Sequence, residues 1–306
     1  MSSPSKVSFL SRGIKIIGDL YRPSAEAPDR KGAAIVVGHP WTAVKEQSSG
    51  LYARLLAKHG FITLAYDAAY QGESEGEPRH LEDPGQRVED IKAAITFLSL
   101  TDGVDEDRLA VLGICASGGY ACNAAQTDTR IKSVATIVAV CTGTMAREGL
   151  PKGSSNLEVL RGQLAAAAKD RNGEGKGEKP TMIPMLPDKL DDAPADMPTA
   201  FRDFATYYRT PRGNHPRAPN IALPRSWDMM ATFDAFRFNE LISPRPLLMI
   251  TGSKAESKSY SEDALELSKG PKEFLIVADK THADLYDDYH GVLPKLLSFF
   301  SESLDT

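Results

Sequence analysis

The chain has 306 residues, of which 42% are hydrophobic, so it is long and apolar enough to bury a large core. Its formal net charge of −5, without any run rich in lysine and arginine, excludes the electrostatic signature of proteins that bind nucleic acid or anionic membranes. Residues 1–6 lack the pattern of a secretion signal, and no apolar run approaches the roughly 20 residues that span a bilayer. We therefore expect a cytoplasmic protein that acts on a small molecule.

The cysteines and histidines predict no bound metal. Cys115, Cys122 and Cys141 are odd in number and lack CxxC spacing, which argues against a disulfide framework and against a zinc site. We expect three free thiols. The six histidines form no ligand cluster along the sequence, so we expect neither a metal nor an organic cofactor.

Residues 7–10 and 13–21 predict a leading β-hairpin, and the pattern changes at residue 33. Apolar, β-branched runs then alternate with amphipathic stretches, which predicts a βαβ series. Strands of this series are expected at 33–37, 61–66 and 109–112, and helices at 48–59 and 85–100. Because these runs are apolar throughout, they indicate strands buried on both faces of a mostly parallel sheet.

The series breaks after a further strand expected at 131–140. Residues 142–240 hold two predicted helices, at 155–169 and 196–208, and stretches rich in glycine and proline. That composition cannot continue a buried sheet. We interpret residues 142–240 as a helical lid inserted over the strand ends.

The core domain is predicted to comprise residues 1–141 and 241–306. Its last elements are strands expected at 246–251 and 273–277 and a helix expected at 290–303. A single core interrupted by one lid is the predicted domain organisation. We also expect a homodimer, with the lid as a candidate interface.

The strand expected at 109–112 ends in a turn of small residues around Cys115. A joint of this kind lifts the side chain at the bend clear of the sheet and directs the first amides of the next helix towards it. Cys115 is therefore a candidate nucleophile, although a free thiol with a pKa of roughly 8.5 needs a base or a helix N-terminus to react at neutral pH. Ser117 is the rival nucleophile, and a third interpretation makes Cys115 an ordinary buried side chain.

Reactive or polarising residues follow four of the expected strands. In open α/β sheets ligands bind outside the carboxyl ends of the strands, so these loops are expected to meet at one site. They are Gly38–Trp41, Asp67 with Gln71–Ser74, Cys115, and Lys280–Asp284.

Several motifs in a fixed order make the chain resemble a known superfamily. They are Gly38–Pro40, Val44–Gln47, Gln71–Ser74, Gly113–Ala116, Ser261–Asp263 and Thr281–Tyr286. With them the chain resembles the dienelactone hydrolase branch of the α/β-hydrolases, and more closely the fungal polyketide transesterases and thiohydrolases. The resemblance implies an α/β-hydrolase fold: a mostly parallel central sheet flanked by helices, with a helical lid. Ser117 stands where the pattern of that branch has glycine.

The same resemblance implies a general base and an acid. His282 follows the last expected strand by a short loop, where the superfamily has the histidine that accepts the nucleophile's proton. The aspartate expected after the strand at 246–251 is replaced by Ala255, so Glu256, one residue later, is the candidate acid. Asp67, Asp284 and Asp287 are alternatives, and a dyad without an acid is a further one.

An oxyanion hole and a substrate pocket complete the predicted site. The backbone N–H groups of Ala116 and Trp41 fit the superfamily's arrangement of oxyanion donors. Candidate pocket residues are His39, Asp67, Tyr207 and Trp227. His39 has an alternative role in shaping the turn before Pro40, Asp67 in fixing the neighbouring loop, and the aromatic residues in ordinary packing.

These features predict a hydrolase or acyltransferase that forms an acyl-enzyme on Cys115. The expected substrate is an ester, thioester or lactone of a hydrophobic, polyketide- or fatty-acyl-like group. By resemblance, an acyl carrier protein or a polyketide synthase is a candidate donor. The alternative is a lactone-forming cyclase, or a binding member of the fold whose catalytic residues have changed, because the aspartate is missing at Ala255.

Overall fold

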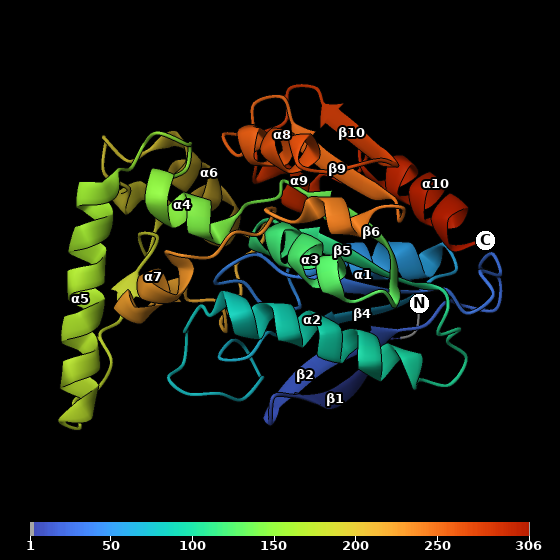
Figure 1. Ribbon diagram of the computed structural model, residues 1–306, viewed down its shortest axis with the longest axis horizontal. Coiled ribbons are helices and arrows are strands. Elements are labelled where there is room, and N and C mark those ends of the chain that lie inside the picture. Colours follow the sequence, from blue (N-terminus) through green and yellow to red (C-terminus); the bar gives the residue numbers. More distant parts are fainter. Residues whose placement is uncertain (1–2, 306) are drawn as a thin grey trace.

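Eight strands form a single sheet in this computed structural model, which describes residues 3–305 (Figure 1). Their order is β1-β2-β4-β3-β5-β6-β9-β10. β2 runs antiparallel to β1 and β4, and the other neighbouring strands are parallel. The bounds are β1 (Ser5–Ser11), β2 (Ile14–Tyr21), β3 (Ala34–Gly38), β4 (Ile62–Tyr66), β5 (Leu109–Ile114), β6 (Ile131–Ile137), β9 (Leu247–Gly252) and β10 (Lys272–Val277). The predicted hairpin and mostly parallel sheet are confirmed.

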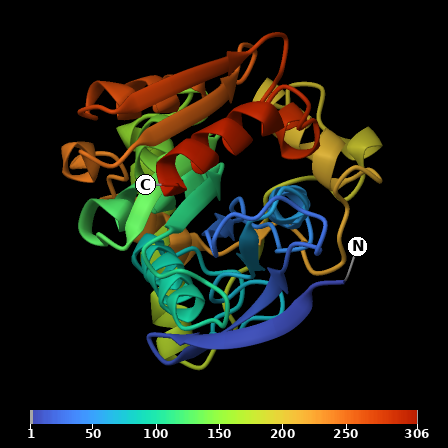
Figure 2. The same ribbon diagram turned by 90° about the vertical axis from the view of Figure 1, so that its right-hand side faces the viewer.

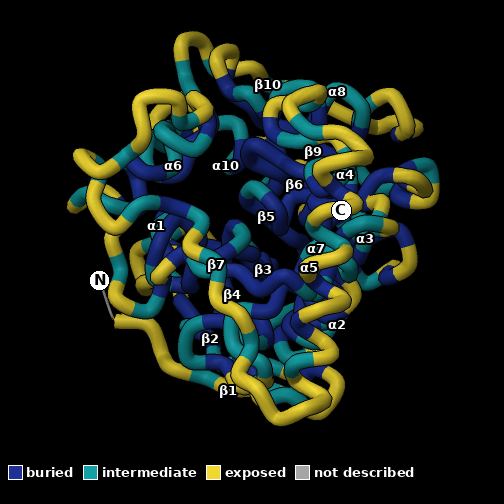
Figure 3. Tube along the Cα trace, turned by 90° about the vertical axis from the view of Figure 1, so that its left-hand side faces the viewer, coloured by how far each residue is buried: buried dark blue, intermediate teal, exposed yellow. Residues whose placement is uncertain are grey.

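The central strands are apolar because both of their faces are covered. Every residue of β3, β4 and β5 is buried, and the central strands are dark blue in Figure 3. The β1–β2 hairpin and the β9–β10 pair lie at opposite edges of the sheet (Figure 2). The carboxyl ends of β3, β5, β6 and β9 therefore meet near the middle of the molecule, away from either edge.

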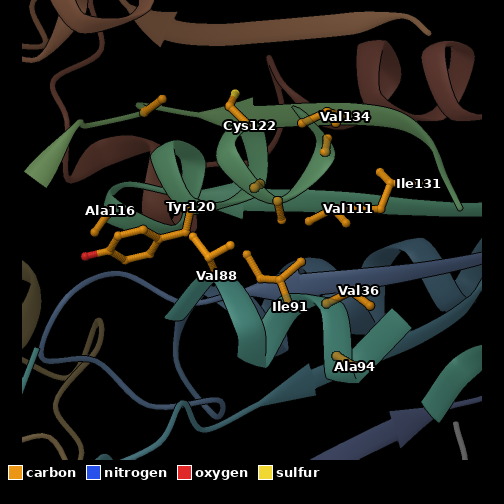
Figure 4. Close-up of a cluster of buried hydrophobic side chains, with 14 of the residues drawn as sticks. Val36, Val88, Ile91, Ala94, Val111, Ala116, Tyr120, Cys122, Ile131 and Val134 are labelled. Carbon is orange, nitrogen blue, oxygen red and sulfur yellow. The ribbon is translucent and has the colours of Figure 1, made fainter. Parts of the chain in front are cut away.

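Helices form a layer on each face of the sheet. They are α1 (Ser48–Lys58), α2 (Pro84–Ser99), α3 (Ala116–Thr127), α8 (Lys258–Glu266), α9 (Asp284–Asp287) and α10 (Leu293–Leu304). α2, α3 and α8 pack on one face, and α1, α9 and α10 on the other. On the first face, Val88, Ile91 and Ala94 of α2 lie close to Val36 and Val111 of the sheet (Figure 4). The apolar side of this amphipathic helix, which was expected at 85–100, is the side that is buried.

The segment between β6 and β9 gathers at one end of the molecule, with α5 outermost (Figure 1). We call residues 142–240 the cap segment. Its elements are α4 (Thr142–Glu148), α5 (Leu157–Gly175), β7 (Ile183–Pro184), η1 (Leu190–Asp192), α6 (Thr199–Tyr208), β8 (Ile221–Ala222) and α7 (Pro224–Met230), and η2 (Asn239–Ile242) leads back to the core. No helix within residues 3–305 is long and apolar enough to cross a bilayer.

The fold departs from the predicted elements at the end of β6, at four short helices and at the unpredicted β7–β8 pair. The strand expected to reach residue 140 ends at Ile137, because the chain turns at Val138 and the Val140 N–H donates to the Cys115 carbonyl at 3.0 Å. The helices α4, α7, α8 and α9 were not predicted. Each has nine residues or fewer, too few for a helical period to stand out in the sequence.

Candidate active site

Cys115 occupies a sharp turn between β5 and α3. Its φ of 56° and ψ of −119° form a conformation that residues with side chains rarely adopt. Two glycines let the strand and the helix come together here. A Cβ on Gly113 would lie 2.2 Å from the Ser117 carbonyl oxygen, and one on Gly118 would lie 2.7 Å from the Ala139 Cβ. The small residues of the predicted turn are thus required by backbone packing.

The Cys115 side chain lines a cavity of about 320 Å³ between the strand ends and the cap segment. Residues that follow β3, β5 and β6 form one side of the cavity, and residues of the cap segment form the other. The lining is mainly apolar and includes Met145, Leu150, Leu186, Phe201, Phe204 and Trp227. A hydrophobic ligand can therefore fill the cavity with one of its atoms against the sulfur.

Two backbone amides act on the same sulfur. The N–H groups of Ala116, at the start of α3, and of Trp41, in the loop after β3, both lower the pKa of Cys115. Amides that converge on a nucleophile can also donate to the oxyanion that forms when the nucleophile attacks a carbonyl. The structure thus places together the two amides predicted for an oxyanion hole.

Burial keeps the thiol and the imidazole uncharged at neutral pH. Loss of solvent raises the pKa of Cys115 to about 11, although hydrogen bonds from Tyr286 and the two amides oppose this rise. Burial lowers the pKa of His282 to about 3, and no charged side chain offsets it. The pair differs from a thiolate–imidazolium pair, in which both groups carry charge before substrate binds.

A tyrosine lies between the predicted nucleophile and the predicted base. The Tyr286 hydroxyl oxygen is 3.2 Å from His282 Nε2, and the same hydroxyl is a hydrogen-bond partner of the Cys115 side chain, where it lowers the pKa of the thiol. Among residues 3–305 no direct hydrogen bond joins Cys115 to His282. Contact between the two groups therefore runs through the phenol.

The other nitrogen of His282 meets a serine, which corrects the prediction of Glu256 as its partner. Ser257 Oγ lies 2.7 Å from His282 Nδ1, and Ser257 is fully buried immediately before α8. Glu256 turns towards the backbone of Ala200 in the cap segment, and its Oε2 is buried without a hydrogen-bond partner. The loop after β9 presents residue 257, and not residue 256, to the imidazole.

The alternative acids are also held elsewhere. Asp284 accepts from the Thr281 N–H at 3.0 Å, and Asp287 pairs with Arg212 across an Nη2–Oδ1 distance of 2.6 Å. Neither carboxylate is bonded to His282. The imidazole is held by hydroxyl groups at both of its nitrogens.

His39 and Ser117 belong to a buried cluster beneath the loop that carries Trp41. The Ser117 hydroxyl donates to the His39 carbonyl oxygen at 2.6 Å and accepts from Arg87 Nη2 at 3.0 Å. The His39 ring accepts from the Ala68 N–H at 3.0 Å. Neither side chain lines the cavity. Their positions therefore contradict the predictions of His39 as a pocket residue and of Ser117 as a nucleophile. Both side chains instead fix the backbone around the thiol.

Asp67 is likewise not a pocket residue. It is fully buried and accepts from the backbone N–H of Lys45 at 2.8 Å and of Glu73 at 2.9 Å. The Lys45 ammonium, also fully buried, lies 2.9 Å from the same carboxylate. Asp67 therefore fixes two loops, as the alternative interpretation of the sequence expected.

The two aromatic pocket candidates have different surroundings. Trp227 lines the cavity and packs edge-on against Trp41, with ring centroids 5.6 Å apart. Tyr207 does not line it: its ring lies behind that of Tyr286, at a centroid distance of 5.0 Å. The prediction of Tyr207 as a pocket residue is corrected to a packing role.

Three residues at the site were not singled out by the sequence. Tyr286 lies in the motif Thr281–Tyr286, and its short separation from His282 in the sequence is the signal that could have identified it. Tyr208 lines the cavity, and burial raises the pKa of its hydroxyl. Ser257 carries no sequence signal, since serine is common in loops.

Comparisons with known proteins identify relatives over most of the chain. Residues 12–191 match the sequence family described as X-Pro dipeptidyl-peptidase (S15 family). The Escherichia coli (strain K12) protein YcjY is 38% identical over 98% of this chain and 99% of its own. The crystal structure of the hypothetical protein PA2218 from Pseudomonas aeruginosa has a TM-score of 0.90, with 38% identity, 98% of this chain covered and 93% of that one.

One similar relative has a name that states an activity. The thiohydrolase aneE of Aspergillus aculeatus is 28% identical over 98% of this chain and 93% of its own. The similarity therefore extends over the core and the cap segment alike.

Proposed function

Because this chain belongs to the α/β-hydrolase family described as X-Pro dipeptidyl-peptidase (S15 family), we propose that it transfers acyl groups through a thioester on Cys115. It is an enzyme of the hydrolase or acyltransferase type. The proposed donor is an ester, thioester or lactone of a hydrophobic, polyketide- or fatty-acyl-like group. The observation that carries the proposal is the Cys115 thiol at a strained turn, facing an apolar cavity of about 320 Å³.

The first half of the reaction forms the acyl-enzyme. The sulfur of Cys115 attacks the carbonyl carbon, while the thiol proton is taken up at His282 Nε2. The carbonyl electron pair moves onto oxygen, where the Ala116 and Trp41 amides donate hydrogen bonds to it. Loss of one such donor typically costs on the order of 10²–10³ in rate. The tetrahedral intermediate then expels the alkoxide or thiolate, which leaves with the proton from the imidazolium.

The second half returns the enzyme to its starting state. Water or an alcohol gives a proton to His282 and attacks the thioester carbon, and Cys115 departs and recovers that proton. With water the reaction is hydrolysis, with an external alcohol it is transesterification, and with a hydroxyl of the acyl chain it is lactone formation. The mainly apolar cavity supports a hydrophobic acyl group in all three cases.

A catalytically altered binding protein is the second candidate. It is favoured by the Ser257 hydroxyl at His282 Nδ1, where hydrolases of this fold use a carboxylate, and by the lowered pKa of His282. Without a charged partner the imidazolium formed during catalysis is less stable, so the chemistry would be slow or absent.

Trapping of the acyl group distinguishes these candidates. The protein is incubated with N-acetylcysteamine thioesters and p-nitrophenyl esters of C4 to C8 acids, quenched in acid and analysed by mass spectrometry. We expect an acyl adduct on the peptide that contains Cys115, absent from Cys115→Ala and retained in Cys122→Ala, whose thiol is buried in the core away from the cavity. Absence of any adduct, together with saturable binding of the intact ester, would favour the binding protein.

A further inference from the structure

The path between Cys115 and His282 is occupied by one hydroxyl group. Tyr286 is almost fully buried, and its oxygen lies 3.2 Å from His282 Nε2. The same hydroxyl is also a hydrogen-bond partner of the Cys115 side chain, so its oxygen can accept from the thiol while its one proton is shared with Nε2. Hydrogen bonds at catalytic groups are often long before the substrate binds. The 3.2 Å separation therefore fits a series of hydrogen bonds that shortens in the reacting complex.

We propose that the Tyr286 hydroxyl carries the proton between Cys115 and His282. The inference rests on the function proposed above, because it assigns the proton route of that reaction. As the sulfur bonds to carbon, the S–H bond breaks and its proton moves to the phenol oxygen. The phenol O–H bond breaks at the same time, and its proton moves to His282 Nε2. The phenol is neutral before and after the step.

The two transfers must be coupled and not sequential. Burial raises the pKa of Tyr286 well above its usual value, so a free phenolate beside the sulfur is too unstable to be an intermediate. A protonated phenol, the other sequential intermediate, is a far stronger acid than the imidazolium. Only simultaneous movement of both protons avoids these two species.

The surrounding residues hold Tyr286 in place. Its ring stacks on Phe204 of the cap segment with planes 11° apart, and it meets Tyr207 edge-on. The neighbouring Leu285 carbonyl accepts from the Tyr52 hydroxyl at 2.8 Å, which ties the short α9 to α1. A phenol fixed on both sides loses little entropy when it transfers a proton, and it is preorganised for the relay.

Tyr286 has an alternative role as a plug. In that case the ring swings away when substrate binds, and Cys115 then meets His282 directly. The two roles predict opposite effects of removing the hydroxyl. A relay is broken by Tyr286→Phe, whereas a plug with one hydrogen bond fewer opens more easily and leaves the reaction equal or faster.

The test compares Tyr286→Phe with the matched control Tyr207→Phe, which removes a buried hydroxyl from the adjoining ring outside the cavity. Acylation of Cys115 by p-nitrophenyl butyrate is followed in single turnovers, in mixtures of H₂O and D₂O. We expect Tyr286→Phe to slow acylation at least about a hundredfold, a typical effect of general acid–base groups, and Tyr207→Phe to change it less than about threefold. A plot of the wild-type rate against the D₂O fraction should be curved, because two protons move in the same step. Transfer of a single proton would give a straight line.

Equal or faster acylation by Tyr286→Phe would overturn the relay, and so would a linear dependence on D₂O in the wild type. Circular dichroism checks the fold of both variants, and the wild-type isotope measurement decides the question if Tyr286→Phe does not fold. Alkylation of Cys115 by iodoacetamide separates this inference from the proposed function, because it needs no acyl donor. We expect Tyr286→Phe to slow alkylation below pH 10 by about tenfold, since a donor to the thiolate is lost. An unchanged alkylation rate would contradict the inference even if no ester acylates the protein.

Discussion

Two polar clusters flank Cys115, and they differ in charge. The elbow cluster consists of Glu82, Arg87, His39 and Ser117, and it contains a buried ion pair with an Nε–Oε1 distance of 3.7 Å. The proton chain consists of Ser257, His282 and Tyr286 and is uncharged at neutral pH. Both are almost fully buried. Charge therefore appears on the side of the thiol where the backbone is fixed, and not on the side where protons move.

This difference has a physical reason. Arg87 donates to the His39 carbonyl oxygen at 2.7 Å and to Ser117. Its positive charge therefore strengthens hydrogen bonds to groups that do not change protonation during the reaction. The loop that carries the Trp41 amide is held by those bonds. The proton chain has to change its protonation during a reaction, and a permanent buried charge beside it would favour one protonation state over the other. The comparison predicts that stability depends on the elbow cluster and reactivity on the proton chain.

The largest expected effect is on stability, from Arg87→Met. This change removes the guanidinium and leaves Glu82 buried without its cation, so we expect the free energy of unfolding to fall by about 3–5 kcal/mol. Guanidinium chloride unfolding measures it. The double variant Glu82→Gln/Arg87→Met should recover part of the loss, because it removes the uncompensated charge. A loss below about 1 kcal/mol would mean that the ion pair does not hold this region.

The second prediction concerns reactivity. Ser257→Asp places a carboxylate beside His282 Nδ1, which should raise the pKa of His282 from about 3 towards its usual value by stabilising the imidazolium. We expect acylation of Cys115 to accelerate by roughly ten- to a hundredfold, with the pH–rate profile shifted to match. Ser257→Ala serves as the control for the change in packing.

The prediction assumes that the low pKa of His282 limits the rate of acylation. An unchanged rate in Ser257→Asp would contradict this assumption if NMR titration confirms that the pKa of His282 has risen. A higher rate in Ser257→Ala than in the wild type would also contradict it. These outcomes test the reactive side of the comparison independently of stability.

The sequence predicted the parts of this molecule that depend on backbone patterns. The apolar runs at 33–37, 61–66 and 109–112 correspond to β3, β4 and β5, since a strand buried on both faces needs an unbroken apolar run. The turn at Cys115 was predicted equally well, because the close packing around it requires glycine at positions 113 and 118. These features are set by local sequence.

The side-chain contacts of the site were less predictable, because they depend on where long-range loops place their atoms. Glu256 and Ser257 are neighbours in the sequence, and only the path of the loop after β9 decides which one meets His282. His39 and Tyr207 carry groups typical of a pocket, yet both point into packed surroundings. Residue type alone does not give the direction of a side chain.

The third prediction is a pH dependence of stability, which per pH unit is smaller than the effect of Arg87→Met. His282 is neutral in the folded protein down to a pKa of about 3, whereas in the unfolded chain it binds a proton below about pH 6.5. The unfolded state therefore binds more protons as the pH falls, and stability decreases from about pH 6.5 towards pH 3, by at most about 1.4 kcal/mol per pH unit for one histidine. Urea unfolding at several pH values measures the slope.

His282→Gln isolates this contribution. Because the other titrating groups stay in place, the difference in slope between the wild type and the variant reports His282 alone, with His39 contributing equally to both. We expect a shallower decline in the variant between pH 6.5 and pH 4. Parallel curves would mean that His282 binds a proton in the folded state, and the proton chain would then carry charge as the elbow cluster does.

The smallest expected effect is that of Glu256→Gln, and it tests the comparison most directly. The Glu256 carboxylate shares a small cavity of about 30 Å³ with Asp203 and His282, yet it makes no hydrogen bond to the imidazole. We expect acylation to change by less than about threefold, because the substitution removes no hydrogen bond to a reacting group. Asp203→Asn is the matched comparison: Asp203 accepts from the Ala283 N–H at 2.8 Å, so its loss should lower the melting temperature more.

If Glu256→Gln instead slows acylation tenfold or more at an unchanged melting temperature, a carboxylate does act on His282, through a water in that cavity. The proton chain would then end in a charge, and the contrast between the two sides of Cys115 would not hold.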